Sequence, residues 1–193
     1  MKRRIIIGIS GASGAIYGIR ALEALRESPD VESHLVMSPS ASRTIAEETN
    51  WTVKDVKALA SVVYNYADIG DAIASGSFRT AGMLVAPCSI KSLSSIANCF
   101  GDNLLTRAAD VCLKERRPLV LMVRETPLHA GHIDIMQRAA NSGAIIMPPV
   151  PAFYSRPATI DEMVNHTVGR ALDLFDIDTG LIKRWTGKSQ STQ

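Results

Sequence analysis

The chain has 193 residues, which is the ordinary length of one domain and is enough to bury a sizeable core. Its formal net charge of +2 is too small to indicate binding to nucleic acid or to an acidic membrane surface. Three cysteines without metal-site spacing, an N-terminus unlike a signal peptide, and no apolar run near the ~20 residues that span a bilayer predict a reduced, cytoplasmic protein.

The first element in the chain is a predicted strand, turn and helix. Three isoleucines starting at Ile5 indicate a buried strand that ends near Ile9, and apolar residues at helical spacing predict a helix over 15–26. The turn between them, Ser10-Gly11-Ala12-Ser13-Gly14, offers two hydroxyls and two glycines. Glycine lets the backbone approach a ligand, and a helix N-terminus offers free N–H groups to an anion. The pattern favours a phosphate site, although a tight turn without a ligand has the same sequence.

The second strand, predicted over 34–37, bears on the kind of nucleotide. A dinucleotide site usually has an acidic residue about 20 residues beyond the glycine turn, at the end of this strand, to bind the ribose hydroxyl. Here the strand ends in Ser38. We therefore expect a mononucleotide or another phosphate rather than NAD.

The rest of the chain alternates helices with strands. Capping signals at Ser38-Pro39, Thr52, Asp102 or Asn103, and Thr159 predict helix starts. We expect helices ending near residues 49, 98, 114, 142 and 175, a short helix from 53, and strands over 61–63, 83–86, 119–123 and 144–147. Pro87 is expected to end the strand at 83–86. Residues 148–157 contain four prolines and predict a loop.

This alternation predicts an α/β fold with three layers and a doubly wound, mostly parallel sheet. We expect a single domain over residues 1–186 and a disordered polar tail over 187–193. Such sheets bind ligands at the carboxyl ends of their strands. The residues expected there carry hydroxyls, glycines, one cation and one acid: Ser10 to Gly14, Ser38, Ser89, Ser92, Arg124 and Glu125. Any one of them could be a solvated loop residue, but together they predict a site for a phosphate-bearing ligand.

Two charged groups are candidates for chemistry. Arg124-Glu125 directly follows a buried strand, where the alternative is a loop ion pair of little energetic value. Arg107 and Lys114 lie two turns apart on one helix face with Asp110 between them. On its pattern alone, this second group favours a solvated, salt-bridged stripe.

The remaining candidates are weaker. Glu48 ends a predicted helix, and its pattern favours solvent. Tyr154, in the proline-rich loop, is equally often a packing residue. Cys88 could have a lowered pKa before a helix, but without a readable histidine partner a structural cysteine is favoured. His129 and His132 form no metal motif, and we predict no metal.

Several blocks of the chain, taken together and in this order, closely resemble the UbiX/PAD family of flavin prenyltransferases. Earlier family names are phenylacrylic acid decarboxylase and 3-octaprenyl-4-hydroxybenzoate carboxy-lyase. The resemblance covers about residues 3 to 185 and suggests a bacterial paralogue serving hydroxyarylic acid decarboxylation. Val123 stands where a proline often precedes Arg-Glu. The blocks are Ser10-Gly-Ala-Ser-Gly with Tyr17-Gly18, Ala86-Pro-Cys-Ser89, Asn103 to Asp110, Lys114-Glu-Arg-Arg-Pro118, Arg124-Glu125-Thr-Pro127 and Phe153-Tyr154.

The resemblance implies a flavodoxin-like Rossmann fold that holds FMN. It implies transfer of a dimethylallyl group from dimethylallyl phosphate to reduced FMN, first to N5 and then closing a ring at C6, without a metal. The product, prenylated FMN, serves UbiD-type decarboxylases. The resemblance also implies a large homo-oligomer, commonly a dodecamer, with FMN at subunit boundaries.

Site residues follow from the resemblance by motif position. It implies catalytic roles for Ser13, Glu48, Lys114 and Glu125, with either Glu125 or Glu48 as the general acid. Those expected to bind FMN are Gly11, Ala12, Ser13, Ser38, Ser89, Ile90, Lys91, Ser92 and Arg124. Those expected around the dimethylallyl phosphate are Arg107, Lys114, Glu125, Tyr154 and Arg170, with Trp185 at the edge of the site. Tyr154 and Arg170 are expected to reach a neighbouring subunit's site, because neither follows a strand end.

Two alternatives remain open at this point. A flavin-dependent cysteine decarboxylase has the same fold, but it carries a Pro-x-Met-Asn-x-x-Met block, and Met147-Pro148 lacks the asparagine. A non-catalytic FMN-binding subunit of an aromatic acid decarboxylase is the other alternative.

Overall fold

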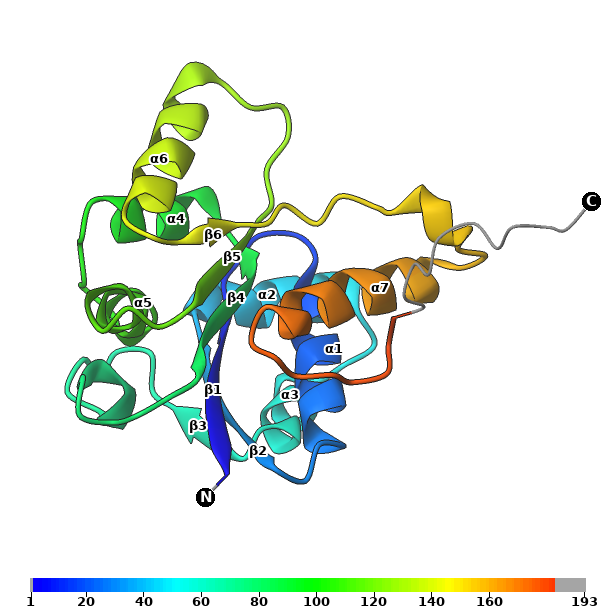
Figure 1. Cartoon of the computed structure of the whole chain (residues 1–193), viewed down its shortest axis with the longest axis horizontal. Helices are drawn as coiled ribbons and strands as arrows, with labels where there is room; N and C mark the ends of the chain where they lie inside the picture. Colours follow the sequence, from blue (N-terminus) through cyan, green and yellow to red (C-terminus); the bar gives the residue numbers. More distant parts are fainter. Residues whose placement is uncertain (1, 183–193) are drawn as a thin grey trace, which may run out of the picture.

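The computed structural model describes residues 2–182, which contain one six-stranded sheet (Figure 1). Every strand pairs in parallel, in the order β3-β2-β1-β4-β5-β6. The predicted doubly wound α/β class is therefore confirmed. The strands are β1 (Arg3–Ile9), β2 (Val31–Met37), β3 (Val62–Tyr64), β4 (Gly82–Cys88), β5 (Leu119–Val123) and β6 (Ile145–Ile146).

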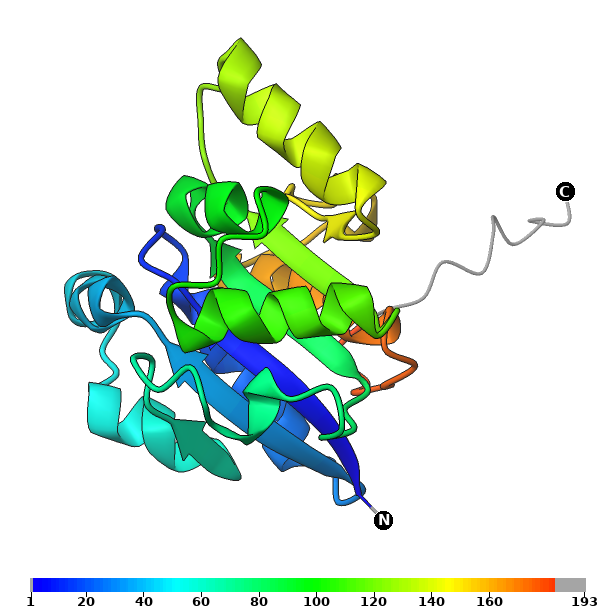
Figure 2. The ribbon, with the colours of Figure 1, turned by 90° about the vertical axis from the view of Figure 1, so that its left-hand side faces the viewer.

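Helices cover both faces of the sheet (Figure 2). On one face, α1 contacts α2, α3 and α7, and on the other face α4 contacts α5 and α6. No helix among residues 2–182 is long and apolar enough to cross a membrane. The helices are α1 (Ala15–Arg26), α2 (Pro39–Glu48), α3 (Val53–Leu59), α4 (Ile90–Ala97), α5 (Leu104–Lys114), α6 (Ala130–Asn141) and α7 (Ile160–Asp173), with 3-10 turns η1 (Ala72–Ala74) and η2 (Phe153–Ser155).

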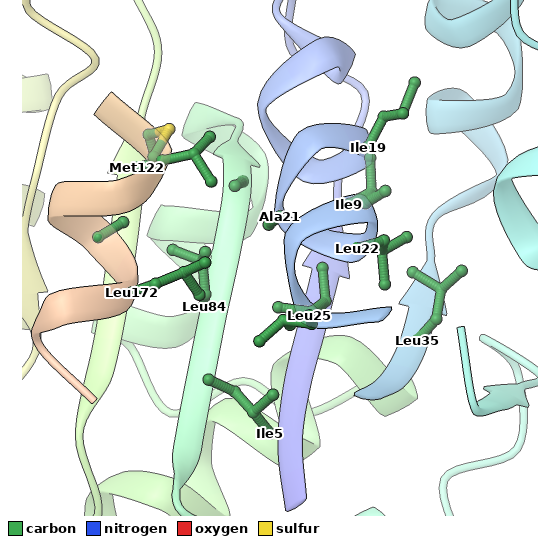
Figure 3. Packing of buried hydrophobic residues seen from close by; sticks show 14 of the residues in the cluster. Ile5, Ile9, Ile19, Ala21, Leu22, Leu25, Leu35, Leu84, Met122 and Leu172 are labelled. Atoms are coloured by element: carbon green, nitrogen blue, oxygen red, sulfur yellow. The ribbon is translucent and has the colours of Figure 1, made fainter. Parts of the chain in front are cut away.

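The core follows from the alternation of side chains along the central strands. In β1, Ile5, Ile7 and Ile9 pack toward α1 and α7, whereas Ile6 packs toward α5 on the other face. Figure 3 shows the first of these two layers, where Leu22 and Leu25 of α1 lie over β1. Because both faces are buried, these strands read as continuous apolar runs rather than as alternating sequences.

The capping signals predict the helix starts well. Ser38, Thr52, Asn103 and Thr159 each accept a hydrogen bond from the backbone N–H three residues later. These bonds satisfy amides that have no partner inside the helix, which is why the sequence signal is reliable.

Several boundaries differ from the prediction. The strand expected to end before Pro87 continues to Cys88, with a shift of register between Val85 and Cys88, because the ladder accommodates the proline at this irregularity. The strand expected over 61–63 lies one residue later, and the strand over 144–147 is only two residues long. Helix α6 begins at Ala130, two residues earlier than expected, because His129 caps it by accepting the N–H of Gly131. The predicted tail over 187–193 lies outside the described residues.

Helix α1 lies very close to β4. A Cβ atom on Gly18 would be 2.3 Å from the carbonyl oxygen of Ala86 and 2.8 Å from the side chain of Ile9. Only a residue without a side chain fits there, so glycine is required in the middle of a helix where alanine would otherwise be favoured.

We expect Gly18→Ala to lower the free energy of unfolding by about 1–3 kcal/mol, because the added methyl overpacks the contact between α1 and β4. Urea denaturation at one fixed protein concentration measures it. The matched control is Gly70→Ala, where the new Cβ would have only Asp68 Oδ1 nearby, at 3.5 Å, and where we expect a change within about 0.5 kcal/mol. Equal stabilities of the two variants would contradict the packing argument.

Candidate active site

The site begins where the strand order reverses, between β1 and β4. The chain leaves β1 toward α1 and leaves β4 toward α4, on opposite faces, which opens a crevice at the carboxyl ends of the strands. Ser10 lies in this crevice but is buried. Its hydroxyl donates to the Pro87 carbonyl at 2.7 Å and accepts the Ser89 N–H at 2.8 Å. The expectation that Ser10 offers its hydroxyl to a ligand is therefore wrong, because this hydroxyl ties β1 to the start of α4.

The glycine turn packs against α2. A Cβ on Gly11 would lie 2.3 Å from the Cβ of Ser40, so the turn can approach α2 this closely only with glycine at this position. From the same helix, the Thr44 hydroxyl lies 3.3 Å from the Gly11 carbonyl oxygen and 3.2 Å from the Ser40 carbonyl oxygen, which share its proton. The backbone of Gly11, Ala12 and Ser13 is thereby held at the mouth of the crevice.

Glu48 reaches this turn from the last residue of α2. Its carboxylate accepts the N–H of Gly14, the N-cap residue of α1, at 2.7 Å. A carboxylate at a helix N-terminus is favourable because the free amides there carry partial positive charge. Glu48 is exposed, as its pattern predicts, and it also lies at the site because α2 returns its end to the glycine turn.

A cavity of about 520 Å³ brings the main candidates together. Its polar lining includes Ser13, Glu48, Arg124 and Glu125. Its apolar lining comes from α1, the end of β5, the proline-rich loop and the start of α7. Its residues are Ile16, Tyr17, Val123, Pro148, Pro149, Val150, Ile160 and Val164.

Arg124 influences this cavity by its charge. Its backbone N–H donates to the Cys88 carbonyl at 3.0 Å, which fixes the turn after β5 beside the end of β4. Burial raises the pKa of the Tyr17 phenol, and the positive charge of Arg124 opposes part of that rise. Arg124 and Tyr17 thus both line the cavity and are close enough for the charge of one to act on the other.

The helix N-termini of α2 and α4 lie at the same edge. Ser38 accepts the Ala41 N–H at 3.2 Å, and Ser89 accepts the Ser92 N–H at 3.3 Å. Ile90 packs on the core, so only its backbone can serve a ligand, whereas the Lys91 side chain is exposed. These two helix N-termini are rich in hydroxyls and lie next to the glycine turn, whose position is fixed by close packing. Together they fit the phosphate of a mononucleotide such as FMN.

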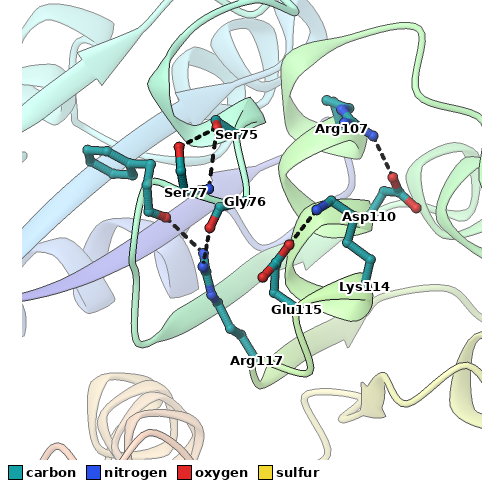
Figure 4. A network of polar contacts seen from close by, with 9 residues as sticks. Ser75, Gly76, Ser77, Arg107, Asp110, Lys114, Glu115 and Arg117 are labelled. Carbon is teal, nitrogen blue, oxygen red and sulfur yellow. Dashed lines mark hydrogen bonds and ion pairs between the residues drawn. The ribbon is translucent and has the colours of Figure 1, made fainter.

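The residues of α5 lie away from the cavity. Arg107 pairs with Asp110 at 2.7 Å, and Lys114 pairs with Glu115 (Figure 4). Lys114 ends α5 just before β5 begins, so it lies at the amino edge of the sheet. The neighbouring Arg117 donates to the carbonyls of Gly76 and Phe78. Within one chain, the structure shows the ion-paired stripe and does not bring Arg107 or Lys114 to the site.

Tyr154 and Arg170 are also separate from the cavity. Tyr154 lies in residues 148–159, hereafter the arm, which extends sideways from β6 to the start of α7 in Figure 1. Its hydroxyl lies 2.9 Å from Nε2 of His166, and Arg170 pairs with Asp173 at 2.8 Å. Large apolar residues of the arm are exposed, with Val150 and Phe153 each 72% exposed. Trp185 lies outside the described residues.

Comparisons with known proteins identify the family. A protein-family model described as Flavoprotein matches residues 1–172. The chain is 59% identical over 187 residues to the flavin prenyltransferase UbiX of Thauera aromatica, covering 97% of this chain and 96% of the relative. The chain belongs to the UbiX family of flavin prenyltransferases.

Solved structures of the family match along almost the whole chain. The structure of AnUbiX (PadA1) in complex with FMN and dimethylallyl pyrophosphate has a TM-score of 0.95 and 49% identity, covering 98% of this chain and all of that one. A dodecameric FMN-dependent UbiX-like decarboxylase from Escherichia coli O157:H7 has a TM-score of 0.93 and 48% identity, covering 95% of this chain and all of that one.

The remaining candidates have structural roles in this family member. Burial raises the pKa of both Cys88 and Cys112 to about 12, so neither thiol is a nucleophile near neutral pH. The rings of His129 and His132 are in contact, with centroids 3.6 Å apart and planes tilted by 32°. Between residues 2 and 182, no group of three or more His, Cys, Asp or Glu side chains could hold a metal ion.

Sequence reasoning missed part of the cavity wall. Tyr17 belongs to a block that resembles the family, but no role was predicted for it. Val150, Ile160 and Val164 were not predicted as site residues. The last three join the wall because the arm leads back over the site into α7. Such a contact depends on the course of the backbone through the proline-rich loop, which no local sequence pattern predicts.

Proposed function

We propose that this chain transfers a dimethylallyl group from dimethylallyl phosphate to reduced FMN, and that its prenylated FMN serves a UbiD-type aromatic acid decarboxylase. The observation that carries this proposal is the cavity at the switch point, which has both polar and apolar lining residues. The polar side chains suit a phosphate, and the apolar ones suit a short hydrocarbon. Bound there, reduced FMN supplies the nucleophilic nitrogen.

The seat for FMN is the carboxyl edge of the central strands. The backbone of Gly11, Ala12 and Ser13 would bind the flavin at the glycine turn. The helix N-termini after Ser38 and after Ser89, including residues 90–92, would bind its phosphate through amides and hydroxyls. Arg124 would balance negative charge beside the flavin.

The polar side chains that line the cavity would assist departure of the phosphate. Arg124 places a positive charge where negative charge grows on the leaving oxygen, which is preorganised electrostatic stabilisation. Glu125 would protonate that oxygen as general acid, with Glu48 as the other candidate. Among residues 2–182, Glu125 accepts only the N–H of its neighbour Thr126, whereas Glu48 accepts the N–H of Gly14. Ser13 would donate to the donor phosphate.

We further propose a homo-oligomer, likewise a dodecamer, whose subunits complete one another's sites. Arg107, Lys114, Tyr154 and Arg170 would then bind the donor phosphate in a neighbouring subunit. The exposed apolar arm supports this, since apolar surface of this kind marks contact with another chain. Three free thiols, two of them buried, support a reducing, cytoplasmic location.

The first test incubates the protein anaerobically with reduced FMN and dimethylallyl phosphate and measures the mass of the released flavin. We expect the flavin to gain a dimethylallyl group without added metal. A protein that binds FMN tightly but leaves its mass unchanged would be a non-catalytic flavin-binding subunit, and the proposed activity would be wrong.

We expect Glu125→Gln to slow prenylated FMN formation by about 100-fold or more, because an amide cannot protonate the leaving phosphate. FMN affinity, measured by flavin fluorescence quenching, should stay within about 2-fold, since the polar shape is kept. The matched control is Glu47→Gln on the exposed side of α2, where Glu47 pairs only with Arg43 among the described residues. An unchanged rate in the Glu125 variant would assign the general acid to Glu48.

Shared sites predict complementation between two inactive variants. Arg124→Ala and Arg170→Ala should each be poorly active alone, and co-expression should restore activity because mixed oligomers contain some sites with both arginines. Differently tagged copies purified in two steps prove that the variants assemble together. If the mixed oligomer stays as inactive as its parents, Arg124 and Arg170 act within one chain.

A further inference from the structure

His166 lies between two residues that the proposed function uses. It is on α7, four residues before Arg170, so the two side chains are neighbours on one helix face. Its Nε2 atom lies 2.9 Å from the Tyr154 hydroxyl, and the two rings meet edge to face with centroids 5.4 Å apart. The three side chains thus form one cluster on the outer side of α7.

The arm is fixed to α7 around this cluster. Glu162, one turn before His166, accepts the Ala158 N–H at 2.6 Å. Between the arm and α7 lies a cavity of about 340 Å³, lined by His166, Glu162, Arg156 and Asn165 among others. Tyr154 is therefore held at its base by the arm and at its hydroxyl by His166, although the residue is 57% exposed.

We propose that His166 is a positioning residue that aims the Tyr154 hydroxyl proton at the donor phosphate. This rests on the proposed function, in which Tyr154 binds that phosphate. A phenol has one proton to donate. If His166 donates Nε2–H to the Tyr154 oxygen, the phenol keeps its own proton for a phosphate oxygen. Arg170 beside them adds the positive charge that an anion requires.

The test compares two substitutions at one position. His166→Gln keeps an N–H donor near the place of Nε2, whereas His166→Leu has none. On the holoenzyme with oxidised FMN, where no transfer occurs, the Kd for dimethylallyl phosphate is measured by calorimetry. We expect His166→Leu to weaken binding about 5-fold, the effect of a hydrogen bond worth roughly 1 kcal/mol. We expect His166→Gln to stay within about 2-fold of the wild type.

Kinetics and a double mutant separate positioning from structure. With reduced FMN, His166→Leu should raise KM by a similar factor and leave kcat within about 2-fold, as expected for loss of uniform binding. Tyr154→Phe should weaken binding at least as much, and adding His166→Leu to it should cause no further loss, because the histidine acts through the phenol. If His166→Leu disturbs folding or FMN content, His166→Asn replaces it, since its shorter side chain cannot reach the phenol.

The outcomes distinguish this inference from the proposed function. If Tyr154→Phe weakens phosphate binding and the histidine variants do not, the inference is overturned while the function stands. If losses in the two variants add, His166 acts independently of Tyr154 and the inference is likewise overturned. Absence of any mass gain on the flavin in the wild-type protein would overturn the proposed function, whatever the binding constants are.

Discussion

The close approach of β1, α1 and β4 at the switch point is the constraint on which the rest of the site depends. Gly18 lets α1 lie against the Ala86 carbonyl, and the buried Ser10 hydroxyl joins the ends of β1 and β4. These contacts fix where the glycine turn ends and where α4 begins. The helix N-termini that favour an anion are thereby set at one edge before any ligand binds, so little ordering cost would remain for binding.

The second organising feature is the end of α2. A helix that starts at Ser38 and ends at Glu48 presents an N-terminus at the edge of the sheet and returns a carboxylate to the Gly14 amide. One helix therefore supplies both an N-terminus that can bind a phosphate and an acidic side chain. This arrangement explains why Glu48, an exposed residue at the end of a helix, lines the cavity together with Glu125.

The sequence was informative wherever local chemistry decides structure. Proline and hydroxyl residues at Ser38-Pro39, Thr52 and Thr159 predicted helix starts because capping acts within three residues. The strand ends placed Arg124 and Glu125 correctly at the polar edge, because all parallel strands deliver their carboxyl ends to one side.

Local patterns failed where two distant segments meet. Ser10 was expected to serve a ligand, but its hydroxyl is used by Pro87 and Ser89, which lie 77 and 79 residues away. Strand β4 continues through Pro87 because its hydrogen-bonded pairing with β5 shifts register between Val85 and Cys88, and not because of a signal in its own sequence. The positions of Val150 and Ile160 in the cavity lining could not be predicted either, since they depend on how the arm folds back toward the site.

The charges of one chain bear on the proposal that subunits complete one another's sites. Among the described residues, the cavity is lined by one arginine, Arg124, and by two carboxylates, Glu48 and Glu125, which is a poor balance for a doubly charged phosphate. The cations that would correct the balance, Lys114 and Arg170, lie in the last turns of α5 and α7 outside the cavity, each paired with an acid. Both can contribute if a neighbouring copy brings them to the cavity, and the exposed apolar arm offers the surface for such a contact. Assembly and phosphate binding would then be thermodynamically coupled, because the same contacts that bury the arm would complete the charge balance of the site.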